Sequence, residues 1–255
     1  MKLLFLIHLC LLPYLLMAQA DNEIQVYASP ITEKGVTFVE LHSNYTFKGM
    51  KGLSNPKSVR FLNETLEITH GFGGNFEIGF YFFNAFDPNG KYQYQGSQIR
   101  PRYTVPEKCN WPFGASLSIE FGFFRPHSDS DFVWQGEIRP IIDKTFGNWY
   151  FSFNPNMDFA VSGDDKQIGL APQLKSVYTI KEKVGVGMEY YTLLGSFKKI
   201  LPGKQQEHLL GPVIDFYFHP DIEFNFGYFF GLTPGSDQSV FKLLLGRRFA
   251  GKKAK

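Results

Sequence analysis

Two serines, a histidine and two acids lie together in one short stretch, His127-Ser128-Asp129-Ser130-Asp131. These residue types can supply the nucleophile, the general base and the orienting acid of a hydrolase. However, adjacent residues of a turn rarely converge as a triad, and Pro126 followed by alternating serine and aspartate is typical of a solvated loop. We therefore interpret the stretch as a loop. Lipid hydrolysis, and Ca²⁺ binding by the oxygens of Asp129 and Asp131, are kept as alternatives.

The histidines of the chain do not have the spacing of a metal motif. His42, His70 and His219 fall on different predicted strands, so we expect each to be a hydrogen-bonded histidine of the interior or the rim. The glycines of residues 71–74 are followed by no helix that could hold a phosphate, and they predict a hairpin turn instead. The sequence thus predicts no catalytic residue, no metal and no cofactor.

A larger set of charged residues lies on the polar side of segments whose opposite side is apolar. Charges at mid-strand must pair or meet water. Two interpretations remain open: a polar passage with a weak preference for cations, or a salt-bridged network that fills the lumen. The predicted lumen residues are Glu77, Arg100, Arg102, Glu120, Glu137, Arg139, Asp158, Lys175, Glu189, Asp215 and Lys242.

The elements that position these charges are predicted strands of about ten residues with alternating apolar and polar side chains. The clearest is 113–123, where Leu117 and Phe121 lie opposite Ser116 and Glu120. Twelve such segments are expected. They are 36–47, 61–72, 75–86, 95–105, 113–123, 132–142, 149–159, 169–180, 184–191, 209–218, 222–230 and 239–249.

Composition agrees with a strand protein and excludes several classes. With 44% hydrophobic and 20% charged residues in 255, the chain is not disordered. A formal net charge of +2 provides no electrostatic footprint for nucleic acid, so we expect no nucleic-acid partner. The aromatic share of 17% is high, and Phe and Tyr favour strands.

The predicted connections alternate between short turns and longer polar loops, which is the asymmetry of an outer-membrane barrel. A soluble barrel would turn its apolar files inward, but files this aromatic on every strand would overfill a small interior. Turned outward they meet lipid. We therefore predict an all-β fold, a closed antiparallel transmembrane β-barrel of about 12 strands.

The N-terminus resembles a cleaved export signal. A charged start precedes an apolar run that ends at Ala18-Gln19-Ala20, a small-x-small cleavage site. Removal of residues 1–20 leaves Cys109 as the sole thiol, so no intramolecular disulfide is possible. The expected organisation is a signal peptide (1–20), a short periplasmic segment (21–35), the barrel (36–249) and a basic C-terminal extension (250–255).

Several motifs resemble the outer-membrane protein family named for the meta-pathway of phenol degradation. They are Glu64-Thr65-Leu66-Glu67-Ile68, Gly147-Asn148-Trp149-Tyr150, Gly185-Val186-Gly187-Met188-Glu189-Tyr190-Tyr191, Gly211-Pro212, and Phe229-Phe230-Gly231-Leu232-Thr233-Pro234-Gly235-Ser236-Asp237 before the last strand.

This resemblance implies a barrel of the Gram-negative outer membrane that passes small or hydrophobic molecules. The implied partners are outer-membrane lipid, the barrel insertion machinery and an unidentified small-molecule solute. Phe249 resembles the terminal aromatic of an assembly signal, although six residues follow it. The leading hypothesis is a passive channel or facilitator and not an enzyme. A lipid hydrolase and a closed structural barrel are the alternatives.

Overall fold

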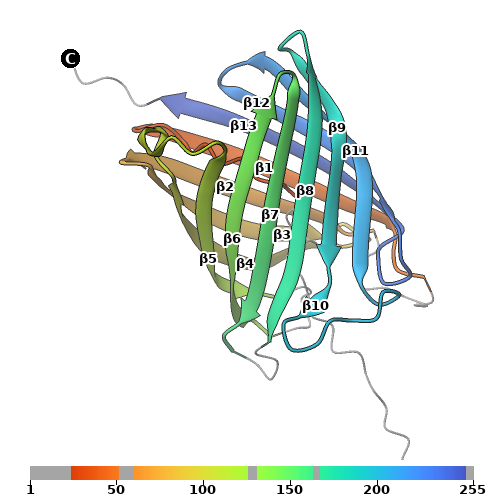
Figure 1. The fold of residues 1–255 in the computed structure, drawn as a ribbon. Coiled ribbons are helices and arrows are strands. Elements are labelled where there is room, and N and C mark those ends of the chain that lie inside the picture. The colour runs from red at the N-terminus through yellow and green to blue at the C-terminus, as the bar shows by residue number, and fades with distance from the viewer. Residues whose placement is uncertain (1–23, 52–59, 126–130, 163–166, 251–255) are drawn as a thin grey trace, which may run out of the picture.

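The computed structural model describes residues 24–51, 60–125, 131–162 and 167–250, which are mostly strand (Figure 1). Twelve long strands form one antiparallel sheet that closes into a barrel, which confirms the predicted fold class. The two-residue strand β10 (Gly195–Ser196) and the 3-10 turn η2 (Glu107–Cys109) lie in connections. The long strands are β1 (Val36–Lys48), β2 (Leu62–Gly73), β3 (Phe76–Phe86), β4 (Tyr92–Thr104), β5 (Gly114–Phe124), β6 (Val133–Phe146), β7 (Trp149–Ala160), β8 (Ile168–Ile180), β9 (Val184–Leu193), β11 (Glu207–His219), β12 (Ile222–Gly231) and β13 (Ser239–Ala250).

The sheet closes because the first strand pairs with the last. β1 and β13 run antiparallel, with Leu41 opposite Leu245 and Asn44 opposite Lys242. The other long strands pair with their neighbours in the sequence, including β9 with β8 and with β11. Closure satisfies the backbone donors and acceptors that an open edge would leave unpaired, which a strand structure in lipid requires. No helix in the described parts of the chain is long and apolar enough to cross a membrane.

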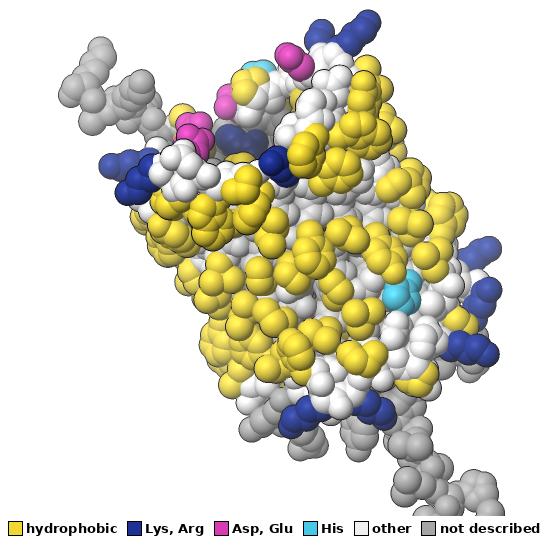
Figure 2. Space-filling view, viewed as in Figure 1, with side chains coloured by type: hydrophobic (Ala, Val, Ile, Leu, Met, Phe, Trp, Pro, Cys, Tyr) yellow, Lys and Arg dark blue, Asp and Glu magenta, His cyan; other side chains and the backbone are white. Residues whose placement is uncertain are grey.

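Apolar side chains cover the outside of the barrel and polar ones line the inside. On β5, Leu117, Ile119 and Phe121 are 44%, 43% and 41% exposed, whereas Ser118 and Glu120 are buried. Figure 2 shows hydrophobic side chains spread over the wall, with Lys and Arg gathered toward its ends. A soluble barrel would have the opposite polarity, so this wall is built to meet lipid.

The two ends of the barrel differ in the length of their connections. At the end where β1 begins and β13 finishes, Gly74 and Asn75 turn β2 into β3 with φ angles of +63° and +66°. Gly147 and Asn148 turn β6 into β7 at the same end. At the opposite end most connections are longer, such as residues 194–206 between β9 and β11, and residues 105–113 between β4 and β5 are the long exception at the first end. By the usual asymmetry of outer-membrane barrels, we name these ends the periplasmic rim and the extracellular rim.

Two predicted strand limits differ from the structure by more than two residues. β6 continues to Phe146 instead of ending at residue 142, because Thr145 pairs with Tyr150 and leaves a two-residue turn. β4 begins at Tyr92 instead of residue 95, because the register shifts at Gln95 and the bulge interrupts the period-two pattern.

Aromatic rings cluster on the wall near both rims. Toward the periplasmic rim, the Trp149 ring lies 5.9 Å from Phe151 and 5.2 Å from Tyr178, between ring centroids. Toward the extracellular rim, the Phe123 ring lies 5.3 Å from Phe132. Aromatic girdles of this kind are typical of the membrane interfaces of a transmembrane barrel.

A charge on the lipid-facing wall should destabilise the barrel. Ile119 lies midway along β5. We expect Ile119→Arg to lower the free energy of unfolding in lipid vesicles by about 2 to 4 kcal/mol, because the guanidinium loses its hydration in the hydrocarbon core. Phe146→Arg at the periplasmic end of β6 is the control, with an expected loss of no more than about 1 kcal/mol. Equal losses in urea unfolding would contradict the lipid-facing orientation.

Candidate functional site in the barrel lumen

The charged residues of the inner face meet in three groups, the first of which joins β2, β3 and β4. Arg100 donates hydrogen bonds to Glu67, to Glu77 at 3.1 Å and to Thr69 at 3.0 Å. Arg102 lies 3.6 Å from Glu77. All these side chains are buried. Their charges are therefore compensated by ion pairs and hydrogen bonds rather than by bulk water.

The second group joins β5, β6 and β7. Glu120, Glu137 and Asp158 lie in one row across the three strands. Arg139 donates to Glu137 at 2.5 Å and lies 3.8 Å from Glu120. Asn156 donates to Glu137 at 3.2 Å. Three acids share one base in this group, which makes this part of the wall acidic.

The third group joins β8, β9, β11 and β13. The Nζ atom of Lys175 lies 3.1 Å from Glu189 and 2.9 Å from Asp215. The Nζ atom of Lys242 lies 2.6 Å from the other carboxylate oxygen of Glu189. Asn225 donates to Asp215 at 2.6 Å. All the charged residues predicted to face the lumen thus lie on the inner side of the barrel, so their role depends on what occupies the space between the groups.

Part of that space is occupied by the chain itself. From the sequence we expect residues 21–35 to be periplasmic, but the structure buries Ile24, Val26, Tyr27 and Ser29 inside the barrel. We call residues 24–34 the lumen segment. It lies inside because its apolar and hydrogen-bonding groups find partners on the inner wall.

Tyr27 binds the wall through both its backbone and its side chain. Its backbone N–H donates to Asn154 at 2.7 Å, and its carbonyl oxygen accepts from Ser152 at 2.6 Å. Its hydroxyl donates to Glu67 at 3.2 Å and lies 2.9 Å from the hydroxyl of Tyr81. Cation–π contacts add to this hold. The guanidinium carbons over the Tyr27 ring are those of Arg100, Arg102 and Arg139, at 5.2, 5.6 and 4.4 Å from the centroid.

The first charge group also binds the segment. The backbone N–H of Thr32 donates to Glu77 at 2.6 Å. Arg102 donates to the carbonyl oxygens of Ala28 and, at 3.0 Å, of Pro30. Ion-paired wall residues therefore use their remaining hydrogen-bonding capacity on the segment.

Asp143 holds the segment near the periplasmic rim. It accepts hydrogen bonds from the backbone and the hydroxyl of Ser29, at 2.6 and 2.7 Å, and from Tyr150 at 2.9 Å. A cavity of about 1010 Å³ opens here, lined by Ser29, Asp143 and the β4–β5 connection around Trp111. The sequence predicts a turn at Asp143, whereas the structure places this residue on β6. The feature that could have identified Asp143 as a lumen residue is its even spacing from Glu137, which puts both side chains on the inner face.

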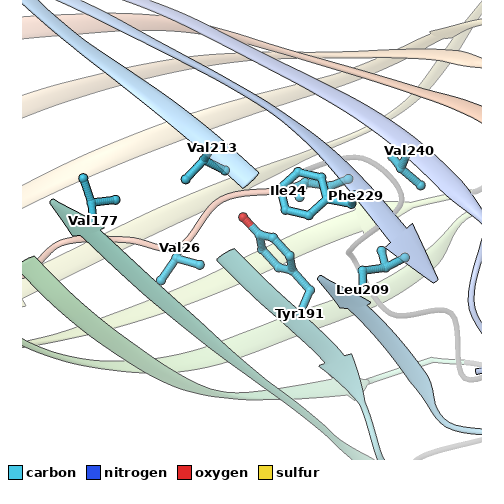
Figure 3. Packing of buried hydrophobic residues seen from close by; sticks show 8 residues of the cluster. All are labelled: Ile24, Val26, Val177, Tyr191, Leu209, Val213, Phe229 and Val240. Carbon is cyan, nitrogen blue, oxygen red and sulfur yellow. The ribbon is translucent and has the colours of Figure 1, made fainter. Parts of the chain in front are cut away.

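An apolar patch on the opposite part of the wall receives the start of the segment (Figure 3). Ile24 and Val26 pack among buried side chains of β8, β9, β11, β12 and β13, with the Tyr191 and Phe229 rings 5.3 Å apart. This patch is not among the sites predicted from the sequence. Its wall residues are an even number of positions from the inward-facing polar residues of the same strands, and this spacing places them on the inner face. The wall residues are Val177, Tyr191, Leu209, Val213, Phe229 and Val240.

Two glycines allow the segment to leave the lumen and enter the sheet. Gly35 has a φ of +77°, which turns the chain into β1, and its N–H donates to the carbonyl of Gly71 at 2.8 Å. A Cβ at Gly71 would collide with the carbonyl oxygens of Thr32 and Glu33. Close approach of the two backbones thus requires glycine on β2.

The structure does not assemble a hydrolase site from the described residues. Ser236 bonds to the backbone of His208, whereas the ring nitrogens of His208 lie 2.5 Å from Tyr190 and 2.8 Å from Gln206. No serine hydroxyl contacts a histidine ring within the described ranges. The Ser/His/acid stretch itself lies outside them, except for the exposed Asp131.

Phe249 lies on the lipid-facing side at the end of β13, opposite Thr37 of β1, and Arg247 stands 5.2 Å from its ring centroid. Its part in assembly stays a prediction. The predicted signal peptide and residues 251–255 lie outside the described residues.

No family model matches this chain, and no curated protein sequence matches it. Solved structures do match in fold. The COG4313 outer membrane channel from Pseudomonas putida F1 is similar with a TM-score of 0.61 and 12% identity, over 89% of this chain and all of that one. The KdgM porin has a TM-score of 0.53 and 12% identity, over 83% of this chain and 99% of that one. The NanC porin has a TM-score of 0.54 and 11% identity, over 84% and 99%.

These likenesses establish a shared fold. The chain is a β-barrel of the outer-membrane type, and its apolar wall agrees with a place in the bacterial outer membrane. A shared fold does not specify a solute, which depends on the residues of the lumen.

Proposed function

We propose that the chain is a passive outer-membrane channel for a small solute, and that the lumen segment closes it in the state described here. The observation that carries this proposal is the extended segment inside the barrel. About eight strands enclose a space that wall side chains fill, whereas 16 leave a wide channel. A twelve-strand lumen that holds a polypeptide segment has the width for a small solute once the segment leaves.

The way the segment is held supports reversible opening. Its hydrogen bonds to the wall run through the side chains of Asn154, Asp143 and Glu77, whereas backbone pairing with the sheet begins near Lys34. Each such hydrogen bond contributes about 1 kcal/mol net, or somewhat more when the partner is charged. Release also exposes Ile24 and Val26 but restores the conformational freedom of the segment.

The charged wall favours a small polar solute, with a weak preference for cations because acids outnumber bases in the second charge group. Resemblance to the family named for the meta-pathway of phenol degradation, and likeness to channels and porins, both support transport. The family resemblance adds hydrophobic molecules as candidate solutes. The apolar patch around Phe229 offers such molecules a contact surface. We propose no enzymatic activity.

Single-channel recording tests the proposal. Residues 21–255 are refolded, the barrel is verified by heat-modifiable gel mobility, and the protein is inserted in a planar bilayer. We expect stepwise currents separated by long closures, and a reversal potential in a KCl gradient that indicates K⁺ preference. Glu137→Gln should weaken that preference, while Glu182→Gln in the exposed β8–β9 turn should not. A folded barrel without current at any potential would favour the closed structural barrel instead.

A further inference from the structure

Three side chains with metal-ligating atoms meet on the inner face of β1 and β2. Glu40 and His42 are two residues apart on β1 and therefore share a face. Glu67 of β2 lies directly opposite Glu40. One ligand atom from each residue lies within 4.8 Å of the others. All three residues are at least 97% buried.

The histidine ring of this group has no close hydrogen-bond partner among the described residues. Neither Nδ1 nor Nε2 of His42 makes a hydrogen bond in the described structure, and the same is true of Oε1 of Glu40. The nearest polar contact of the ring is Nε2 to Oε2 of Glu67, at 3.5 Å. A buried polar atom that is left unpaired is destabilising. The ring thus lacks the close hydrogen bond expected from the sequence, and a ligand between these groups would supply the missing partner.

The charges around the group also favour a cation. Two carboxylates directly opposite each other on neighbouring strands repel. Arg100 is bound to Glu67 and Glu77, and Arg248 lies 3.2 Å from Glu223. Both arginines attract Glu40 electrostatically, but among the described residues neither forms a close ion pair with it. A divalent ion between Glu40 and Glu67 would convert their repulsion into attraction.

We propose that Glu40, His42 and Glu67 bind a divalent first-row transition-metal ion such as Zn²⁺ in the wall of the lumen. Imidazole nitrogen with carboxylate oxygens suits Zn²⁺, whereas Ca²⁺ and Mg²⁺ prefer oxygen ligands alone. Ligand atoms about 2.0 to 2.2 Å from a tetrahedral zinc lie roughly 3.3 to 3.6 Å apart. Small side-chain rotations would bring the three atoms to that separation, and a water molecule would complete the coordination.

The lumen segment contacts this site through Tyr27. The Tyr27 hydroxyl donates to Oε2 of Glu67, the same oxygen that faces His42. Oε1 of Glu67 is already held by Arg100 and Thr69. A bound metal ion would therefore compete with Tyr27 for Oε2, and removal of the Tyr27 hydroxyl should strengthen metal binding.

Isothermal titration of ZnCl₂ into refolded residues 21–255 in detergent tests the site, with Cys109→Ser in every variant to remove the exposed thiol. We expect one saturable equivalent of Zn²⁺, no comparable uptake of Mg²⁺, and tighter binding in Tyr27→Phe. Loss of a direct ligand should weaken binding at least as much as the roughly 10 to 100-fold that loss of an outer-shell partner costs. His42→Ala and Glu40→Gln should both show this loss.

His70→Ala is the matched control, because His70 is also a strand histidine but is 2.9 Å from the hydroxyl of Thr37. Unchanged Zn²⁺ affinity in folded His42→Ala, or the absence of saturable binding, would overturn the proposal. If His42→Ala does not fold, the Co²⁺ absorption spectrum of the protein that keeps His42 is the second test. A shift of the ligand-field bands in Glu40→Gln would support the site. Bands that are unchanged in Glu40→Gln would refute the site. Metal binding is measured independently of channel conductance. The metal-site proposal can therefore fail while the channel proposal holds, and the channel proposal can fail while the metal site holds.

Discussion

Removal of the lumen segment should convert a mostly closed barrel into a mostly open one. The variant lacks residues 21–33 of the refolded chain and keeps Lys34, which pairs with Gly71. A net preference for the closed state of about 2 to 3 kcal/mol corresponds to an open fraction of roughly 0.6 to 3%. Its loss should therefore raise the mean single-channel open probability by well over tenfold at the same potential.

Single substitutions in the lumen segment should change the open probability by smaller amounts. Tyr27→Ala removes the ring beneath three guanidinium groups and should raise the open probability part of the way. Glu33→Gln, at an exposed residue of the same segment, should leave it unchanged. Closure that persists in the shortened chain, with heat-modifiable mobility intact, would mean that the wall side chains themselves block the lumen.

Arg100→Met should be the most destabilising single substitution among the wall charges. It leaves Glu67 and Glu77 buried without their shared cation, and breaking a buried ion pair on one side costs about 3 to 5 kcal/mol. Urea unfolding followed by tryptophan fluorescence measures the loss. The long side chain of methionine keeps much of the volume, so the loss reports charge rather than a cavity.

Arg248→Met is the matched control on β13. Arg248 and Glu223 form an ion pair at 3.2 Å, but their side chains are 35% and 37% exposed, so water replaces the lost partner. We expect a loss of no more than about 1 kcal/mol there. Similar losses for Arg100→Met and Arg248→Met would show that the first charge group is hydrated and not buried.

The alternation of side chains was enough to predict the barrel and the orientation of its wall charges. On β5, for example, Ser118 and Glu120 face inward because they alternate with Ile119 and Phe121, and no knowledge of the neighbouring strands is needed. Alternation fails where a bulge adds a residue, as at Gln95 of β4, so that strand was predicted too short.

The lumen segment could not be predicted from the same pattern. It has no period of its own, and its partners Glu67, Asp143 and Asn154 come from strands far apart in the sequence. The group of Glu40, His42 and Glu67 was missed for a related reason. A long connection joins β1 to β2, so the sequence does not specify which residue of β2 lies opposite Glu40.

Reversible locking of the segment tests the central claim most directly. Ser29 and Asp143 contact each other, so Ser29→Cys with Asp143→Cys, in a Cys109→Ser background, should form a disulfide between segment and wall. Single-channel currents are recorded from the oxidised protein before and after a reductant is added. We predict that the oxidised barrel stays closed and that reduction restores openings. Currents of the same size and frequency in a fully oxidised barrel would contradict the segment's role as the closing element.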